Sequence, residues 1–143
     1  MTGKTRILFI CTANAARSQM AEGYLKARHG DQYEVFSAGF RPAGRISSRA
    51  IQVMQEIGID ISKNTSKSIE TFNTIPIDLA VTLCDNAQPV CPIIHSAKKT
   101  IHKGFPDPHL TPGTDAELLE GYRRARDAIC AWIDATFAKG LPG

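Results

Sequence analysis

The sequence lacks any hydrophobic run that approaches the roughly 20 residues a membrane-spanning helix needs. Its residues 1–5 lead directly into a short apolar run, without the apolar stretch and small-residue cleavage site of a secretory signal. Internal repeats, low-complexity tracts and linkers are absent as well. We therefore expect a single domain over residues 1–143 that is cytoplasmic and has no membrane partner.

A large excess of charge of one sign is also missing. The chain has 17 Lys and Arg residues against 14 Asp and Glu residues, which gives a formal charge of +3. This excess is too small and too scattered to predict a nucleic acid partner, although it can help to attract a small anion.

Closely spaced cysteine pairs of the kind that bind zinc are absent, and the four histidines show no finger-like spacing. The four cysteines are Cys11, Cys84, Cys91 and Cys130. In a cytoplasmic chain they indicate catalysis or redox chemistry rather than structural disulfides, and we expect no metal site. Cys130 falls inside a long amphipathic pattern, so we expect it to be a small core residue.

Short apolar runs alternate with helical patterns along the chain. Strands are expected at residues 6–11, 33–38, 77–83 and 100–102, and helices at residues 18–29, 47–56 and 115–137. This alternation predicts an α/β fold with an open parallel sheet. Ligands bind such sheets outside the carboxyl ends of the strands, which is where Cys11 and Cys84 lie. The two cysteines are therefore expected at one rim of the sheet.

The most informative motif is Cys11-Thr-Ala-Asn-Ala-Ala-Arg-Ser18, between the first strand and the first helix. Its alanines permit a tight curl, and Asn14 tolerates the left-handed conformation that such a curl requires. The backbone N–H groups can then point inward and bind an oxyanion at the positive end of the helix. The residues expected to bind it are Thr12, Ala13, Asn14, Ala15, Ala16, Arg17 and Ser18.

Cys11 is the candidate nucleophile of this loop. A sulfur at a helix N-terminus is stabilised as the thiolate, and the Ser18 hydroxyl can add a hydrogen bond. Arg17 offers a planar fork that matches two oxygens of a phosphate-like ion. The alternative is a buried cysteine followed by an exposed arginine, because the spacing alone also arises by chance. The position between a strand and a helix favours catalysis.

Three segments resemble a known family. Residues 7–22 resemble the N-terminal signature of the low-molecular-weight tyrosine phosphatase superfamily, and Gly104-Phe-Pro-Asp-Pro108 resembles its acid loop. Residues 81–92 resemble the redox segment of its thioredoxin-coupled arsenate reductase branch. The resemblance extends from about residue 5 to about residue 137. It implies a three-layer fold with a four-stranded parallel sheet flanked by helices.

The resemblance also implies a reaction, the reduction of arsenate to arsenite in arsenic detoxification. It implies Cys11 as nucleophile, Arg17 as oxyanion clamp, Asp107 as general acid, and Cys84 and Cys91 as a shuttling thiol pair. Three thiols supply the two electrons without a cofactor, and an external thiol reductant such as thioredoxin, or else a glutaredoxin, resets the enzyme.

The residues around these positions allow other interpretations. Asp107 lies between two prolines, which stiffen its loop, but such a sequence is also common in surface turns. Cys84 and Cys91 are seven residues apart, about 10 Å along a helix. Because the Cα atoms of a disulfide usually lie within about 7 Å, we expect their segment to rearrange during turnover. The alternative for this pair is two core cysteines.

The sequence departs from the family pattern at several positions. Ala16 stands where several relatives have a second loop cysteine, and His109 and Leu110 stand where the phosphatases carry tyrosines. Some reductases of the branch bind potassium through an Asn, a Glu and a later acidic residue. Here Lys67 takes the place of the acid, and we expect its ammonium to replace the ion.

Two other functions remain open from the residues. One is a phosphatase that acts on phosphoesters through Cys11, Arg17 and Asp107 alone. The other is a non-catalytic oxyanion sensor, against which the intact acid loop argues.

Overall fold

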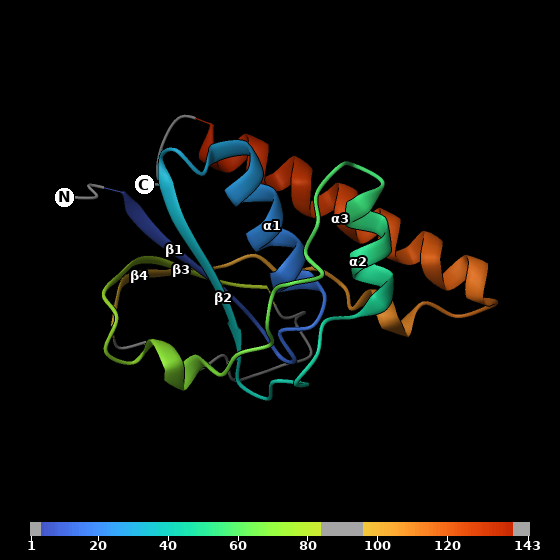
Figure 1. Ribbon diagram of the computed structural model, residues 1–143, viewed down its shortest axis with the longest axis horizontal. Coiled ribbons are helices and arrows are strands. Elements are labelled where there is room, and N and C mark those ends of the chain that lie inside the picture. The colour runs from blue at the N-terminus through green and yellow to red at the C-terminus, as the bar shows by residue number, and fades with distance from the viewer. Residues whose placement is uncertain (1–3, 84–95, 139–143) are drawn as a thin grey trace.

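The computed structural model describes residues 4–83 and 96–138 of the chain (Figure 1). Its elements, in chain order, are β1 (Thr5–Cys11), α1 (Arg17–His29), β2 (Tyr33–Gly39), α2 (Ser48–Gln55), η1 (Ile69–Phe72), β3 (Ile77–Thr82), β4 (Ala97–His102), η2 (Pro108–Leu110) and α3 (Asp115–Phe137). None of the helices in these two ranges is long and apolar enough to cross a membrane.

Within the described residues the sheet has four strands in the order β2-β1-β3-β4, and every pair is parallel. Ile7 of β1 lies opposite Val35 of β2 and Leu79 of β3. The predicted four-stranded parallel sheet is therefore confirmed. The strand at the β4 edge is longer than predicted, because its polar, largely exposed residues carry no hydrophobic pattern and its extended form comes from pairing with β3.

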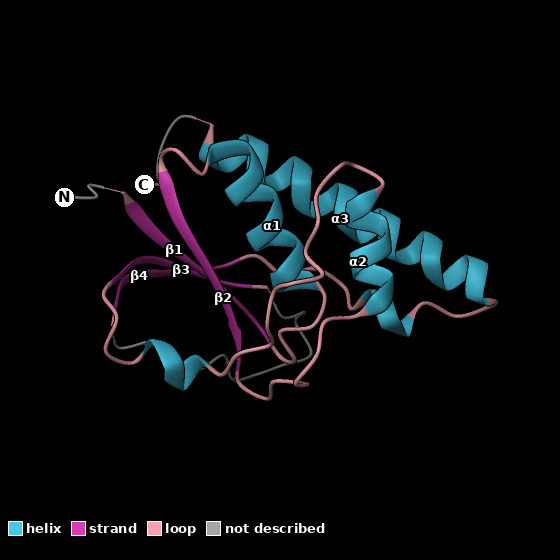
Figure 2. Ribbon diagram, viewed as in Figure 1, coloured by secondary structure: helices cyan, strands magenta, loops and turns pink. Residues whose placement is uncertain are grey.

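The helices and the sheet form layers (Figure 2). The three α-helices gather on one face of the sheet, and the 3-10 helix η1 lies on the other. Side chains of β1 alternate between the two, as strand geometry requires. Ile7 and Phe9 belong to the large core under the α-helices, whereas Leu8 and Ile10 belong to a smaller core with Phe72 of η1. The predicted three-layer α/β fold is confirmed.

Helix α1 enters the core with its N-terminal half. Nine consecutive residues, Arg17–Leu25, are buried, and the helix emerges into solvent only at residues 26–28. Such a segment is surrounded on all sides, so its polar side chains need partners within the protein. Those partners build the site described below.

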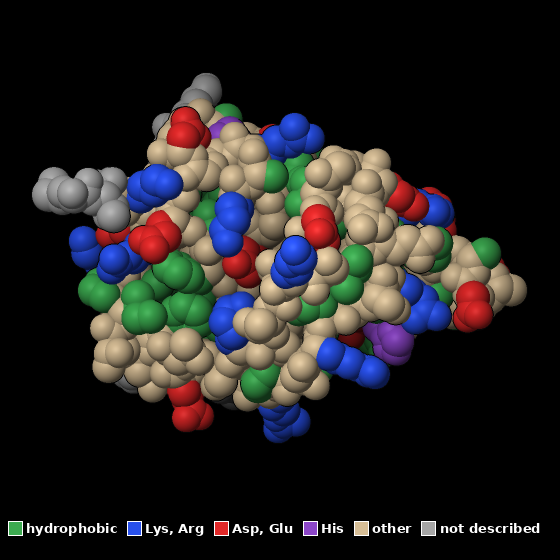
Figure 3. All heavy atoms as spheres, in the orientation of Figure 1, with side chains coloured by type: hydrophobic (Ala, Val, Ile, Leu, Met, Phe, Trp, Pro, Cys, Tyr) green, Lys and Arg blue, Asp and Glu red, His purple; other side chains and the backbone are tan. Residues whose placement is uncertain are grey.

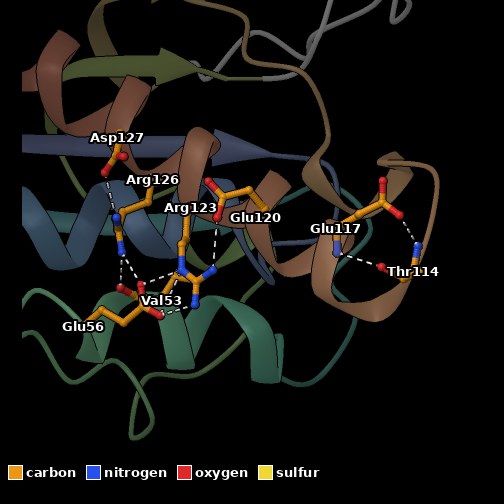
Figure 4. A network of polar contacts seen from close by, with 8 residues as sticks. All are labelled: Val53, Glu56, Thr114, Glu117, Glu120, Arg123, Arg126 and Asp127. Atoms are coloured by element: carbon orange, nitrogen blue, oxygen red, sulfur yellow. Dashed lines mark hydrogen bonds and ion pairs between the residues drawn. The ribbon is translucent and has the colours of Figure 1, made fainter.

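Helix α3 closes over α1 and α2. It begins with a capping box in which Thr114 and Glu117 satisfy each other's backbone N–H groups (Figure 4). Arg126, buried in the face that packs on α2, donates to the Val53 carbonyl at 2.9 Å and to Glu56 at 2.7 Å. Arg123 forms a second ion pair with Glu56, at 2.8 Å. These bonds hold α2 at a defined position beside the carboxyl end of the sheet.

Candidate active site

Cys11 is the last residue of β1, and five loop residues separate it from Arg17, the first residue of α1. Its neighbour in β2 is Gly39, where an added Cβ would lie 2.6 Å from the Thr12 carbonyl oxygen. The close approach of the loop to β2 therefore requires a glycine at this position.

The carboxyl end of β3, after which Cys84 follows in the sequence, is described as far as Leu83. Leu83 follows β3 and donates its N–H to the Ile10 carbonyl at 2.7 Å, so the chain leaves β3 beside the carboxyl end of β1. Cys84 and Cys91 themselves lie outside the described residues, and their roles stay predictions.

The carbonyls of the loop after Cys11 all point away from its centre. Each of the five accepts a hydrogen bond from outside the curl, and the donors to the carbonyls of residues 12–16 are, in order, Arg41 N, Ala43 N with Ser66 Oγ, Gln19 Nε2, Ser47 N and Met20 N. In a trans peptide the C=O and the following N–H point in opposite directions. The N–H groups of residues 13–17 therefore face inward, an arrangement that suits a negatively charged ligand.

Asn14 gives the loop its curl. Among the non-glycine residues that the structure describes, Asn14 is the one with a positive φ, at 49°. This conformation was predicted from the tolerance of asparagine for the left-handed region. Its side-chain oxygen accepts hydrogen bonds from the Lys67 N–H at 2.8 Å and from Gln19 Nε2 at 3.0 Å. Because that oxygen faces two donors, the side-chain nitrogen must face Ser18, to which it donates at 2.8 Å.

The Ser18 hydroxyl lies between the side-chain nitrogen of Asn14 and the sulfur of Cys11. Ser18 Oγ lies 2.8 Å from Cys11 Sγ and already accepts from Asn14. A thiolate carries no hydrogen, so in the ionised form of Cys11 the Ser18 hydroxyl is the donor of this bond. A sulfur that accepts this bond and faces the loop N–H groups is stabilised in its charged, nucleophilic form. Cys11 is 2% exposed, so the sulfur reacts only with molecules that enter the cavity.

Arg17 and Asp107 face each other beside the loop. The Arg17 guanidinium donates to the Phe105 carbonyl at 3.0 Å and lies 3.9 Å from Asp107 Oδ2. The other carboxylate oxygen of Asp107 accepts the His109 N–H at 3.0 Å at the start of η2. Since Oδ1 is held by a backbone donor, Oδ2 is the oxygen that can hold a proton for a departing group.

These residues line one cavity of about 700 Å³. Of the residues predicted for the site, those that line it are Cys11, Thr12, Ala13, Ala15, Ala16, Arg17 and Asp107. The side chains of Asn14 and Ser18 are fully buried on the other side of the loop backbone, where they support the loop and do not line the cavity. The fold thus brings the loop motif of residues 11–18 and the distant Asp107 together at one cavity, as expected.

The cavity also has a basic outer wall that the sequence analysis did not predict. Arg45 and Arg49 line it, together with His109 and Tyr122. Arg45 belongs to the segment after β2 that is bound along the loop through the Thr12, Ala13 and Ala15 carbonyls, and Arg49 lies in the first turn of α2, which follows this segment. A signal existed in the sequence, because basic residues recur after a predicted strand end, where such sheets bind ligands.

Lys67 lies beside the loop on the side away from the cavity. Its ammonium donates to the Thr65 carbonyl at 2.7 Å. Burial lowers the pKa of Lys67, and the nearby carboxylate of Glu22 partly offsets this effect. Glu22 is 6% exposed and accepts a hydrogen bond of 2.5 Å from the Ser37 hydroxyl. The lysine thus brings a positive charge close to a buried carboxylate.

Cys130 takes no part in the cavity. It is partly buried on α3 and packs against the large core, as predicted. Burial raises the pKa of its thiol to about 12, so it carries no charge near neutral pH.

The comparisons with known proteins agree with this geometry. Residues 6–132 match the family described as low molecular weight phosphotyrosine protein phosphatase. A protein of Halalkalibacterium halodurans named arsenate reductase is 47% identical over 136 residues, which are 95% of this chain and 96% of the relative.

Solved structures give the same result. An arsenate reductase in its oxidized state has a TM-score of 0.79 at 30% identity, covering 94% of this chain and 98% of that one. A thioredoxin-dependent arsenate reductase of Corynebacterium glutamicum has a TM-score of 0.64 at 25% identity, covering 92% of this chain and 61% of that one. This chain belongs to the low molecular weight phosphotyrosine protein phosphatase family.

Proposed function

We propose that this protein reduces arsenate to arsenite. The observation that carries the proposal is the sulfur of Cys11, which lies 2.8 Å from the Ser18 hydroxyl at the base of a nest of inward N–H groups. Relatives named arsenate reductase, which match almost the whole chain, supply the substrate class. The oxyanion binds in the nest, with Arg17 beside it.

The first step forms a bond between sulfur and arsenic. The Cys11 thiolate attacks the arsenic of bound arsenate, and Asp107 protonates the departing oxygen, which leaves as water. Asp107 Oδ2 is the oxygen that carries this proton, because Oδ1 accepts the His109 N–H.

The next steps move two electrons to arsenic. A Cys84 thiolate attacks the sulfur of Cys11, the sulfur–arsenic bond breaks with its electron pair on arsenic, and arsenite leaves. Cys91 then attacks Cys84 in the Cys11–Cys84 disulfide, which restores the Cys11 thiol and leaves a Cys84–Cys91 disulfide. A dithiol protein of the thioredoxin class reduces that disulfide, and we place the reaction in the cytoplasm, where such reductants keep thiols reduced.

No cofactor takes part in this scheme, and the charge beside the loop comes from Lys67. The lysine ammonium lies beside Thr65 and close to Glu22, where it takes the role of a bound potassium ion. Rates measured in potassium chloride and in sodium chloride of equal concentration are expected to agree. A rate that rises steeply with potassium contradicts this part of the proposal.

The decisive variant is Cys84→Ser. It should abolish arsenate turnover and leave a single-turnover adduct on Cys11, because the attacking thiol is gone. The unmodified protein, given arsenate without reductant, should yield a Cys84–Cys91 disulfide with a reduced Cys11 in peptide mass spectrometry. Cys130→Ser serves as the matched control and should behave like the unmodified protein, since Cys130 lies outside the cavity. Continued arsenate turnover by Cys84→Ser rejects the relay.

A second candidate activity is hydrolysis of phosphoesters. The cavity of about 700 Å³ is far larger than a free tetrahedral ion, so it has room for the organic part of an ester beside the nest. This reaction uses Cys11, Arg17 and Asp107 and needs no second thiol. Cys84→Ser should therefore spare cleavage of p-nitrophenyl phosphate, whereas Cys11→Ser should abolish both reactions. A protein that turns over neither substrate with any reductant is instead an oxyanion-binding protein.

A further inference from the structure

Gln19 is a fully buried polar residue to which the reaction above gives no role. It follows Ser18 in the first turn of α1 and is 0% exposed. Its side-chain nitrogen lies 3.2 Å from the Asn14 carbonyl, 3.0 Å from Asn14 Oδ1 and 2.9 Å from the Thr65 carbonyl. A buried amide with this many partners in the loop has a large effect on loop geometry.

Asn64 binds the oxygen of the Gln19 amide. Its side-chain nitrogen donates to Gln19 Oε1 at 3.1 Å. The nitrogen of Gln19 faces the carbonyls of Asn14 and Thr65, which can only accept, so these carbonyls and Asn64 favour the same orientation of the amide. Asn64 is half-buried on the segment that runs beside the loop, so it reaches the site from outside the motif.

The side chains form one chain of donors that ends at the sulfur. Asn64 donates to Gln19, Gln19 to Asn14, Asn14 to Ser18, and Ser18 to Cys11. All four hydrogen bonds run in the same direction. Hydrogen bonds in such a series polarise one another, so each strengthens the next toward a negative charge at its end.

We infer that Gln19 and Asn64 are positioning residues for the nucleophile. Gln19 holds Asn14 in its left-handed conformation by hydrogen bonds to the backbone carbonyl oxygen and the side-chain oxygen of Asn14. Asn64 in turn orients Gln19. Together they aim the Ser18 hydroxyl hydrogen at Cys11 Sγ. The inference rests on the proposed function in one respect, that Cys11 is the nucleophile. Neither residue touches substrate, and both act through the loop.

The test is the pH profile of Cys11 alkylation by iodoacetamide, read by mass spectrometry of the Cys11 peptide without arsenate. Gln19→Met keeps the length of the side chain and removes every hydrogen bond. We expect its rate at pH 7 to fall about tenfold, because the Ser18 hydroxyl is no longer aimed at the charged sulfur and the hydrogen bond between them is lost. The rate at high pH, where the sulfur is charged in either protein, should be unchanged.

Other charges near the sulfur are left in place by this variant. Several elements contribute charged or titratable residues to the cavity wall around Cys11. The described ones are Arg17 of α1, Arg45 of the segment after β2, Arg49 of α2, Asp107 and His109 at η2, and Tyr122 of α3. A shift of the profile is then assigned to the donor chain. Gln52→Met, at an exposed position of α2, is the matched control and should leave the profile unchanged.

A purely structural role for Gln19 gives a different result. It predicts a lower Tm with an unchanged pH profile, and that outcome overturns the inference. Asn64→Ala provides a second variant at a half-buried position and should shift the profile in the same direction by a few-fold.

The double variant Gln19→Met with Asn64→Ala tests whether the two residues act in series, along one chain of hydrogen bonds, or independently of each other. Since Asn64 acts through Gln19, Asn64→Ala should add nothing to the shift caused by Gln19→Met. Additive shifts reject the series. Failure of the proposed function is a separate result, because it appears as arsenate turnover by Cys11→Ser and leaves the alkylation data intact.

Discussion

The two described cysteines show how surroundings decide reactivity at the scale of single residues. Cys11 faces the Ser18 hydroxyl and the inward N–H groups of the loop, which are groups that a thiolate can bind. Cys130 is half-buried in α3, and burial raises the pKa of its thiol to about 12. A thiol with such a pKa is uncharged at every pH below about 11.

We therefore expect iodoacetamide at pH 8 to modify Cys11 and to leave Cys130 unmodified in the folded protein. Peptide mass spectrometry after a short exposure measures both sites in one sample. Urea-unfolded protein is the control, because unfolding returns Cys130 to water and should make it reactive. Equal modification of both cysteines in the folded state contradicts this assignment.

Much of the site at this scale was predictable from the sequence, because the loop motif is contiguous. The positive φ of Asn14 and the Ser18–Cys11 hydrogen bond follow from residue types within eight positions. Gln19 and Asn64 were not predicted. Their hydrogen bond joins positions 45 residues apart, and no local pattern indicates such a pair.

At the scale of elements, hydrophobic periodicity predicted the strands and helices that face a core. The pattern failed for β4, whose strand form depends on pairing with β3, and for Arg126, which is buried because it binds α2. Polar contacts between elements carry no periodic signal. The joint between α2 and α3 at Glu56 is such a contact (Figure 4).

This joint predicts a pH dependence of stability. Hydrogen bonds from Arg123 first, and from Arg126, lower the pKa of Glu56 from 4.5 to about 2. A carboxylate whose pKa is lowered by folding contributes stability that is complete above its unfolded pKa and is lost as the pH falls toward the folded value. The loss is therefore expected between about pH 5 and pH 2.

Glu56→Gln should remove this part of the dependence. Its Tm should be lower than that of the unmodified protein at pH 7, and the difference should shrink as the pH falls from 5 to 3. Thermal unfolding followed by circular dichroism measures both. Glu70→Gln, at an exposed position in η1, is the control and should show no such convergence. A Tm difference that stays constant with pH argues against the joint.

At the scale of the whole molecule, charges of both signs are interspersed over the face shown in Figure 3, whereas the cavity gathers positively charged side chains. Arg17, Arg45 and Arg49 line it beside the nest. A ligand that binds only the folded state stabilises it, by about 2.7 kcal/mol at a hundredfold excess over its Kd. Phosphate, a tetrahedral oxyanion, should therefore raise Tm by several degrees.

Differential scanning fluorimetry with increasing phosphate measures this shift, and chloride at equal ionic strength is the control. Arg17→Gln should lose most of the phosphate effect, because the guanidinium lies beside the nest. An equal rise of Tm with chloride, or a full phosphate effect in Arg17→Gln, places the anion elsewhere.

The sequence by itself determined the class of fold and the curled loop after Cys11, because apolar periodicity and a contiguous motif are local properties that residue types specify directly. Only the tertiary structure decided which way the loop carbonyls point, which oxygen of Asp107 accepts the His109 N–H, and how Asn64 and Gln19 are linked to the sulfur through Asn14 and Ser18. These depend on contacts between segments far apart in the chain. The direction of such contacts is set by packing, since a buried donor must find whichever acceptor the fold brings to it.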